Sequence, residues 1–303
     1  MFEQTPQPIR HTADRTLTIL QRPAARDSTE RVERLQTTFR YILYVVVTVF
    51  LFTPFVMTVL SSFKSSAEVI AYPPTFFPSQ WHPENYIQVF IANPNFFRQV
   101  VNGFVVTLLL VGCNLFFCSL VAYAFARLVF PGRNVLFAIM LGTMVIPSWV
   151  TLVPKYVLIQ NLGLVNTYGA LLIQSFVTPF GIFLMTQFFR SVPRELEEAA
   201  IMDGVGWFGA FWKVVLPVAR PALLALGILS FKDHWNSFFD WLVYMQTPDM
   251  FNIQLGLAAF RGVYQNQWDL IMAGSVIAIL PILIIYILGQ RYFVQGVATT
   301  GLK

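Results

Sequence analysis

The sequence predicts an all-α membrane protein whose chain crosses the bilayer six times. Of its 303 residues, 56% are hydrophobic and only 12% are charged, and the mean hydropathy is +0.62. Soluble domains carry about 25% charged residues, so roughly half of the usual charge is missing. The apolar runs are continuous and about 20 residues long, which is the length of a transmembrane helix. A β-barrel is disfavoured, because its strands alternate apolar and polar residues.

The first two expected spans cover residues 41–60 and 100–126. The polar residues 1–38 are expected to form a cytoplasmic lead, and residues 39–303 the membrane domain. No small-residue cleavage site follows the first apolar run, so we interpret it as an uncleaved helix rather than a signal peptide. Several prolines interrupt residues 61–98, which predicts an extramembrane loop with short amphipathic segments.

Four further apolar runs complete the expected set, separated by polar turns and followed by a short tail. A polar turn is expected at residues 155–167, and a loop of about 25 residues precedes the last span. The expected third to sixth spans are 135–153, 168–189, 221–244 and 270–289.

Basic residues are unevenly divided between the two sides that six spans define. Fifteen of the twenty Lys and Arg residues lie in residues 1–40, in 127–133, in 190–220 or in the tail. Loops on the cytoplasmic side of a membrane carry an excess of Lys and Arg. We therefore expect both termini to be cytoplasmic, and we attribute the net charge of +5 to topology rather than to nucleic-acid binding.

One polar segment, residues 191–217, interrupts the apolar chain and is called the polar hairpin below. Ser191 and Pro193 give a helix-start signal, and three acids then fall in the first turns, where the helix dipole favours them. Gly204 is placed to end this helix as a C-cap glycine. Apolar residues at helical spacing predict a second helix that ends at Pro217.

Two interpretations of the polar hairpin are considered: a helix pair that lies on the lipid surface, and an element that docks to another protein. Helices that lie on anionic lipid usually carry basic polar faces. Residues 195–203 instead hold four acids and no base, so the lipid surface would repel them. The composition favours docking to a protein.

Charged residues inside the fifth expected span leave two interpretations open. A charge at the centre of a span costs about 2.5–3.5 kcal/mol on insertion scales, so such residues usually face the bundle interior or water. In one interpretation, Lys232 and Asp233 each pair with a neighbouring helix or extend to the membrane interface. In the other, Asp233 belongs to a polar face that lines a solute path. Four polar residues share one helical face and are the candidates for that path: Asp233, Asn236, Ser237 and Asp240. Trp235, Trp241 and Tyr244 are candidates for sugar stacking or for an interfacial belt.

Several chemical signatures are missing from the chain. There is no G-x-x-x-x-G-K-[ST] loop to cradle ATP phosphates, so energy must come from another subunit or from an ion gradient. The three histidines are far apart, and Cys113 and Cys118 have no metal-ligand companions, so no metal site is expected. No catalytic constellation is visible, and a membrane-embedded enzyme therefore ranks last among the functional classes.

The polar hairpin carries a recognisable pattern: Glu198-Ala199-Ala200, three residues, Gly204, nine residues, then Val214-x-Leu216-Pro217. It resembles the EAA loop of ABC importer permeases, with Val214 in place of the usual Ile. Further stretches resemble sugar permeases of the maltose-transporter G-subunit type, with Asn102-Gly103 departing from the usual Asn-Ser. These stretches are Asn85-Tyr86, the run from Ala122 to Arg127, Gly163-Leu164-x-Asn166-Thr167, Trp235-Asn236-x-Phe238, Gly256-Leu257 and the tail from Gln290 to Gly296.

The resemblance, which covers residues 40–303, implies a type I permease subunit of an ATP-driven sugar importer in a bacterial or archaeal plasma membrane. The implied partners are a second permease, two cytoplasmic ATPase subunits that hold ATP and Mg²⁺, and an extracytoplasmic sugar-binding protein. The chain itself is expected to bind no cofactor and to catalyse no reaction. The residues implied in coupling to the ATPase are Glu198, Ala199, Ala200, Asp203, Gly204, Leu216 and Pro217. The alternative is a stand-alone secondary transporter or channel, for which Asp233 and Asp240 would be ion-coupling carboxylates.

Overall fold

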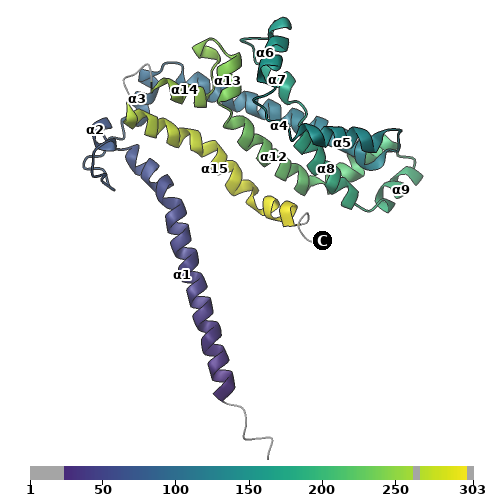
Figure 1. Ribbon diagram of the computed structural model, residues 1–303, viewed down its shortest axis with the longest axis horizontal. Helices are drawn as coiled ribbons and strands as arrows, with labels where there is room; N and C mark the ends of the chain where they lie inside the picture. The colour runs from purple at the N-terminus through teal and green to yellow at the C-terminus, as the bar shows by residue number, and fades with distance from the viewer. Residues whose placement is uncertain (1–23, 262–266, 299–303) are drawn as a thin grey trace, which may run out of the picture. The chain divides into compact units, whose positions relative to one another are not determined.

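The computed structural model describes residues 24–261 and 267–298, and within these ranges all regular structure is helical (Figure 1). The chain divides into two compact units, Met1–Met57 and Thr58–Lys303. The N-terminal unit consists, where described, of most of helix α1 (Ala24–Ser61). The large apolar side chains of α1 from Phe39 to Val56 are exposed, as a lipid-facing or partner-facing span requires. The helix begins at Ala24 and therefore runs through residue 38, and residues 1–23 of the expected lead lie outside the described residues.

The loop after the first span contains short helices, as expected. Helix α2 (Ser66–Val69) is capped by Ser65, whose side chain accepts a hydrogen bond from the Glu68 amide. Helix α3 (Asn85–Ala92) begins beside this turn, because the Asn85 amide donates to the carbonyls of Ser62 and Lys64. These side-chain bonds satisfy backbone groups that the irregular chain leaves without partners.

Helix α4 (Phe96–Arg127) is the central element of the second unit and matches the second expected span. Its buried residues recur at intervals of three and four, which places them along one side of the helix. Helices α8 (Pro179–Ser191) and α12 (Arg220–Trp235) pack against it, and α15 (Trp268–Ala298) packs against α12 (Figure 1). The sixth expected span is contained in α15, which continues well beyond residue 289.

The third expected span, 135–153, is not one helix. Helix α5 (Arg133–Thr143) is followed by turns, and α6 (Leu152–Asn161) begins only after them. Pro147 lies in the interruption, and a proline has no N–H to continue a helical hydrogen-bond ladder. The stretch is apolar on both sides of the break, so its composition predicted one continuous span.

The fourth expected span is two helices, α7 (Gly169–Ser175) and α8, which meet at an angle of 40°. Pro179 begins α8, and the preceding Thr178 is extended, as residues before proline prefer. Asn114 of α4 donates to the Ser175 carbonyl at 3.0 Å and accepts from the Thr178 hydroxyl at 3.1 Å. A buried amide from another helix thus replaces the backbone bonds lost at the break.

Gly181 permits the close approach of α4 to this break. A Cβ atom built there would lie 2.8 Å from both Cys118 Sγ and Thr178 Oγ1. Gly181→Ala is therefore expected to destabilise the protein by about 1–3 kcal/mol, the usual cost of overpacking a core. The measurement is the thermal midpoint of the purified protein in detergent. Gly112→Ala in α4 is the control, because its Cβ would meet nothing within 4 Å, and an equal loss in both variants would contradict the packing argument.

The polar hairpin contains α9 (Glu195–Met202), α10 (Trp207–Ala210), a π-helical turn (Phe211–Val215) and α11 (Leu216–Val218). The fifth expected span is then divided into α12 and α13 (Phe239–Tyr244). A short 3₁₀ turn and α14 (Ile253–Ala259) lie between α13 and α15, the former at Pro248–Met250. By length and composition, three helices can each cross a membrane alone, namely α1, α4 and α15, and two bent helix pairs bring the described spans to five.

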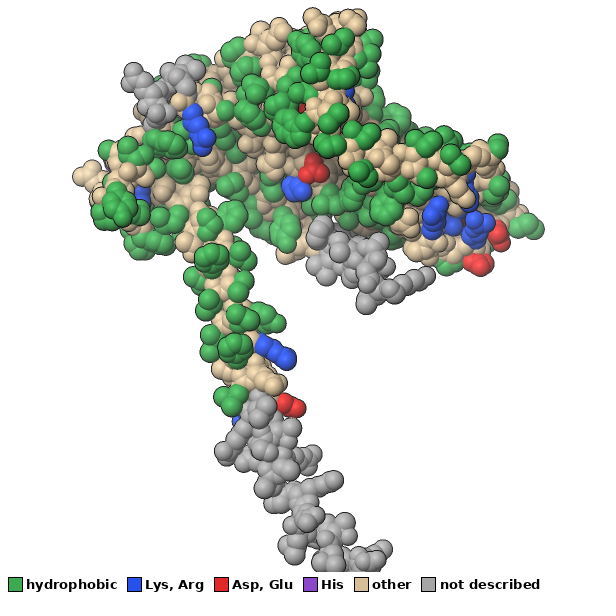
Figure 2. Space-filling view, viewed as in Figure 1, with side chains coloured by type: hydrophobic (Ala, Val, Ile, Leu, Met, Phe, Trp, Pro, Cys, Tyr) green, Lys and Arg blue, Asp and Glu red, His purple; other side chains and the backbone are tan. Residues whose placement is uncertain are grey.

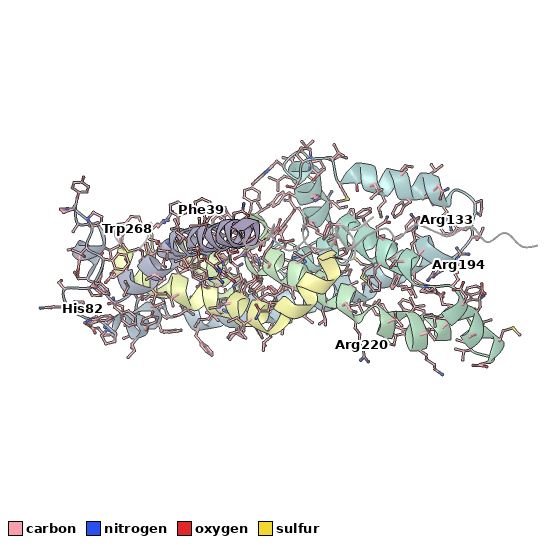
Figure 3. The ribbon with its side chains drawn as sticks, turned by 90° about the horizontal axis from the view of Figure 1, so that it is seen from below. Phe39, His82, Arg133, Arg194, Arg220 and Trp268 are labelled. Atoms are coloured by element: carbon pink, nitrogen blue, oxygen red, sulfur yellow. The ribbon has the colours of Figure 1, made fainter. Side chains whose placement is uncertain are left out.

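The second unit has two chemically different ends. Arg133, Arg194 and Arg220 lie toward one end, while His82 and Trp268 lie toward the other (Figure 3). Lys, Arg, Asp and Glu side chains gather at the end that carries α9, and apolar side chains dominate the visible surface between the ends (Figure 2). This is the charge distribution of a helical bundle whose middle is surrounded by lipid.

Candidate functional site

The turn of the polar hairpin is a complete Schellman motif. The Val205 amide donates to the Ala200 carbonyl and the Gly204 amide to the Ile201 carbonyl, both at 3.0 Å. Gly204 has φ +83°, the left-handed region that favours glycine, which confirms its predicted role as helix terminator. The helix start was predicted too early, because Ser191 ends α8 and α9 begins at Glu195.

The second half of the hairpin changes direction at Ala219. The segment Trp207–Val218 and helix α12 meet at 76°. The Leu216 amide donates to the Phe211 carbonyl, five residues back, and Pro217 has no N–H to donate to the next carbonyl. Phe211, Val215 and Ala219 are buried in a cluster with residues of α4 and α8, so this half of the hairpin is fixed to the bundle.

A buried ion pair fixes the first half. Arg127, the last residue of α4, pairs through Nε with Glu197 Oε1, and both side chains are at most 4% exposed. The Arg127 guanidinium also donates to the Val192 carbonyl at 2.8 Å, and the Tyr123 hydroxyl donates to Glu197 Oε2 at 3.1 Å. This pair could not be predicted from the sequence, because only the tertiary fold brings residues 127 and 197 together. Tyr123 and Arg127, four residues apart on one helix face, were the available hint.

The outer face of the hairpin is free and carries both apolar and acidic side chains. Met202, Phe208 and Trp207 are 87%, 65% and 55% exposed. Large exposed apolar side chains clustered beside polar groups are typical of protein interaction sites. Of the seven residues predicted for coupling, five are exposed and two are half-buried. The exposed residues are Glu198, Ala199, Asp203, Gly204 and Pro217, and the half-buried ones are Ala200 and Leu216. Glu198 makes no ion pair with any described residue, so its carboxylate is available to a partner.

The four residues predicted to line a solute path do not stay together. Ser237 and Asp240 line a cavity of about 200 Å³, called the central cavity below. Asp233 instead pairs with Lys232 at 3.0 Å on an exposed surface, and the Asn236 side chain accepts from Gln254 at 3.4 Å. The charges of Lys232 and Asp233 therefore form an ion pair with each other, which was not among the interpretations of the sequence.

The aromatic residues near these positions are part of the core. Trp235, Trp241 and Tyr244 are each at most 2% exposed, so neither free stacking on a sugar nor an interfacial belt describes them. Trp235 donates from its indole N–H to the Ala278 carbonyl at 2.9 Å, and the Tyr244 hydroxyl donates to Gln174 at 3.1 Å. Trp241 alone of the three also lines the central cavity.

Sequence reasoning missed several residues of the central cavity. Lys155 of α6, Gln174 of α7 and His234 of α12 all contribute to its wall. Lys155 and Gln174 lie in stretches interpreted as a polar turn and an ordinary span, and only the helix breaks bring them to the cavity.

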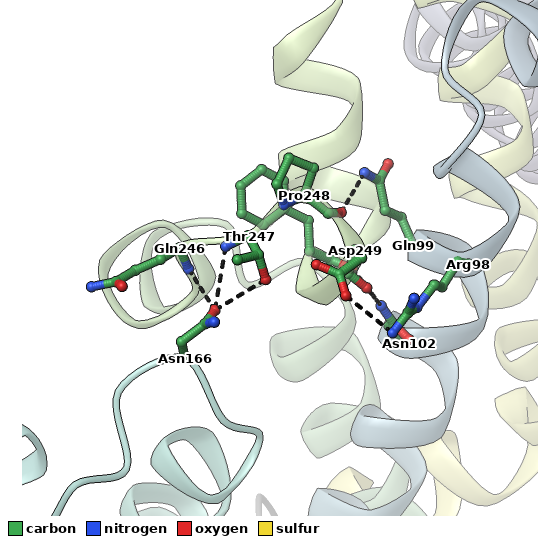
Figure 4. A network of polar contacts seen from close by, with 9 residues as sticks. Arg98, Gln99, Asn102, Asn166, Gln246, Thr247, Pro248 and Asp249 are labelled. Carbon is green, nitrogen blue, oxygen red and sulfur yellow. Dashed lines mark hydrogen bonds and ion pairs between the residues drawn. The ribbon is translucent and has the colours of Figure 1, made fainter.

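A network of polar contacts joins three segments near the start of α4, whereas the hairpin contacts the last residue of that helix (Figure 4). Asn166, in a left-handed conformation with φ 60°, accepts from the amides of Gln246 and Thr247 at 2.9 and 3.3 Å. Arg98 pairs with Asp249 at 3.2 Å. A hydrogen bond from the Thr247 side chain, together with the charge of Arg98, holds the pKa of the Asp249 carboxyl below its usual range. The stabilisation from this carboxylate is thus present above the ordinary Asp pKa, and it is lost only as the pH falls through the lower folded value.

The bent spans, the anchored polar hairpin and the central cavity together define a class of protein, a multi-pass helical membrane transport subunit. The chain belongs to the family of binding-protein-dependent transport system inner membrane components, which it matches over residues 114–299. It is therefore an ABC importer permease, a non-enzymatic membrane component that works with a substrate-binding protein.

Individual relatives agree with this assignment. The chain is 36% identical to the arabinooligosaccharides transport system permease protein AraQ of Halalkalibacterium halodurans, covering 82% of this chain and 90% of that one. It is 31% identical to the diacetylchitobiose uptake system permease protein NgcG of Streptomyces coelicolor, covering 84% and 85%. A chain of a bacterial ABC transporter that imports the acidic polysaccharide alginate has a similar structure, with a TM-score of 0.76, 26% identity and coverage of 87% and 98%.

Proposed function

We propose that this chain is one of two permease subunits of a sugar importer driven by two cytoplasmic ATPase subunits. Its own role is to form half of the solute path and to receive the motion of an ATPase through the polar hairpin. ATP and Mg²⁺ bind to the ATPase subunits, since the chain has no phosphate-binding loop of the G-x-x-x-x-G-K-[ST] type.

The observation that carries this proposal is the construction of the hairpin. Its inner side is held to the bundle by the Arg127–Glu197 pair and by Phe211 and Val215. Its outer side presents Glu198, Met202 and other exposed side chains to a partner. An element that is rigidly joined to the membrane helices and free on its other face can transmit a push from a docked protein.

The cargo is assigned to the sugars because named relatives carry arabino-oligosaccharides, diacetylchitobiose and alginate. An extracytoplasmic binding protein would deliver the sugar to the end that carries the loop network of Figure 4. Ser237 and Asp240 are assigned to the path through this subunit, because both line the central cavity.

The topology proposed for the chain has six spans and both termini in the cytoplasm of a bacterial or archaeal cell. The end of the bundle with Arg133, Arg194 and Arg220 would face the cytoplasm, in agreement with the excess of basic residues in cytoplasmic loops (Figure 3). Helices α5 and α6, with the break between them, would form the third span and bring the five spans identified by length and composition to six.

Deletion of the gene for this chain in its native host tests the proposal. Uptake is measured with a panel of radiolabelled neutral sugars and their uronic-acid counterparts. We expect uptake of at least one sugar to fall to background, to return with the full-length chain, and to require ATP. Unchanged uptake of the whole panel would contradict the proposal. Transport by the purified chain alone, driven by an ion gradient in proteoliposomes, would favour the secondary-transporter alternative.

A further inference from the structure

Three interruptions of helical structure meet at the central cavity. Ser148 lies between α5 and α6, Ser175 ends α7, and Ser237 lies between α12 and α13, and all three line its wall. Non-helical backbone at membrane depth is tolerated only where protein buries it or where it borders a water-filled space. The convergence of three breaks therefore indicates an aqueous cavity inside the bundle.

The cavity lies near the middle of the membrane. Leu110 forms part of its wall, 14 residues after the first residue of α4 and 17 before the last. At 1.5 Å per residue these separations are about 21 and 26 Å along the helix. A solute in this cavity is therefore about halfway across.

The wall suits a ligand with hydroxyl groups. Seven of the ten lining residues are polar. The Ser237 hydroxyl donates to Asp240 Oδ2 at 2.8 Å, which leaves Oδ1 of the carboxylate as an acceptor. The Lys155 ammonium makes no hydrogen bond or ion pair with a described residue and is a free donor. Trp241 adds an apolar indole to the same wall.

The charges of the wall balance. Lys155 contributes one positive charge, Asp240 one negative charge, and His234 is counted as neutral. An acidic sugar would be attracted by the ammonium but would also face the carboxylate, where like charges repel. The volume of about 200 Å³ corresponds to roughly seven water molecules, the scale of one sugar ring rather than a chain of rings.

From these observations we infer that the central cavity binds one neutral sugar unit of the cargo by its hydroxyl groups during transport. Asp240 accepts hydrogen bonds from the sugar, and Lys155 donates to it. This inference rests on the proposed function, and it adds that this subunit itself contacts the cargo and selects against acidic sugars.

The test uses the assembled transporter in proteoliposomes and the sugar identified by gene deletion. Asp240→Asn and Lys155→Met are each expected to raise the KM of uptake at least tenfold, with less than a twofold change in kcat. Asp233→Asn is the matched control, because Asp233 is an exposed acid of neighbouring sequence outside the wall. Ser237→Ala, which removes only the hydroxyl bonded to Asp240, is a milder second variant and is expected to raise the KM about threefold.

The outcomes separate the two proposals. If gene deletion leaves uptake of the panel unchanged, the proposed function fails. If deletion abolishes uptake but the identified sugar is acidic, the inference alone fails. It fails equally if Asp240→Asn, Lys155→Met and Ser237→Ala keep the original KM, or if Asp233→Asn raises the KM as much as Asp240→Asn does.

Discussion

Arg127→Met is expected to destabilise the assembled transporter by about 3–5 kcal/mol and to reduce uptake strongly. The substitution leaves the Glu197 carboxylate buried, 3% exposed and without its cation, and breaking a buried ion pair has this cost. It also removes the donor to the Val192 carbonyl. The first half of the hairpin would then lose its ionic attachment to the end of α4, while the second half keeps its apolar contacts with α4 and α8 through Phe211. The thermal midpoint and the rate of ATP-driven uptake measure the two effects.

A double variant distinguishes the ion pair from other consequences of the substitution. Arg127→Met combined with Glu197→Met removes both charges, and we expect it to recover much of the stability lost in either single variant. Arg133→Met is the control, because Arg133 is a basic residue at the start of the next helix whose side chain makes an exposed hydrogen bond to the Leu128 carbonyl and no ion pair with a described residue. Single variants as stable as the Arg133→Met protein would show that the pair does not fix the hairpin.

Glu198→Lys is expected to abolish ATP-driven uptake while the chain remains folded and inserted in the membrane. Glu198 is exposed and makes no ion pair with a described residue, so its loss costs the isolated chain little. Reversal of its charge would place a cation against the basic residue expected on the ATPase. Glu195→Lys is the matched control on the same helix, and we expect it to retain most of the uptake. Normal uptake by Glu198→Lys would contradict the coupling role of this carboxylate.

Substitutions at Gly204 distinguish backbone strain within this chain from a steric clash with the docked partner. A Cβ built at Gly204 meets nothing within 4 Å, so only its φ of +83° opposes a side chain within this subunit. Asn tolerates this conformation better than Val does. If conformation is decisive, Gly204→Asn retains uptake and Gly204→Val loses it. Loss in both variants, with normal folding, would place the restriction at the docked ATPase.

The long uninterrupted spans were predictable from the sequence, because each leaves a continuous apolar run. Helix α4 differs by only a few residues from the expected 100–126. The helix breaks were not predictable, because Pro147 and Pro179 lie inside apolar runs whose composition alone predicts single spans. Proline in a membrane helix is often tolerated without a break, so its presence did not decide between the two.

Local chemistry was predicted better than tertiary pairing. The glycine that ends α9 could be recognised because its role depends on neighbouring residues alone. The division between buried Glu197 and exposed Glu198 could not, because it depends on where the end of α4 lies. The same limit applies to the central cavity, whose described lining residues come from five helices and the turns between them.

The outer face of the polar hairpin is proposed to dock to an ATPase subunit. Incorporation of the photo-crosslinker p-benzoylphenylalanine at Met202, which is 87% exposed, tests it most directly in the intact transporter. Phe77, 67% exposed in the loop between the first two expected spans, is the control position. We predict a crosslinked product of this chain with the ATPase subunit from position 202 and none from position 77. Adducts from position 202 with lipid alone, or with the extracytoplasmic binding protein, would contradict docking of the hairpin to the ATPase.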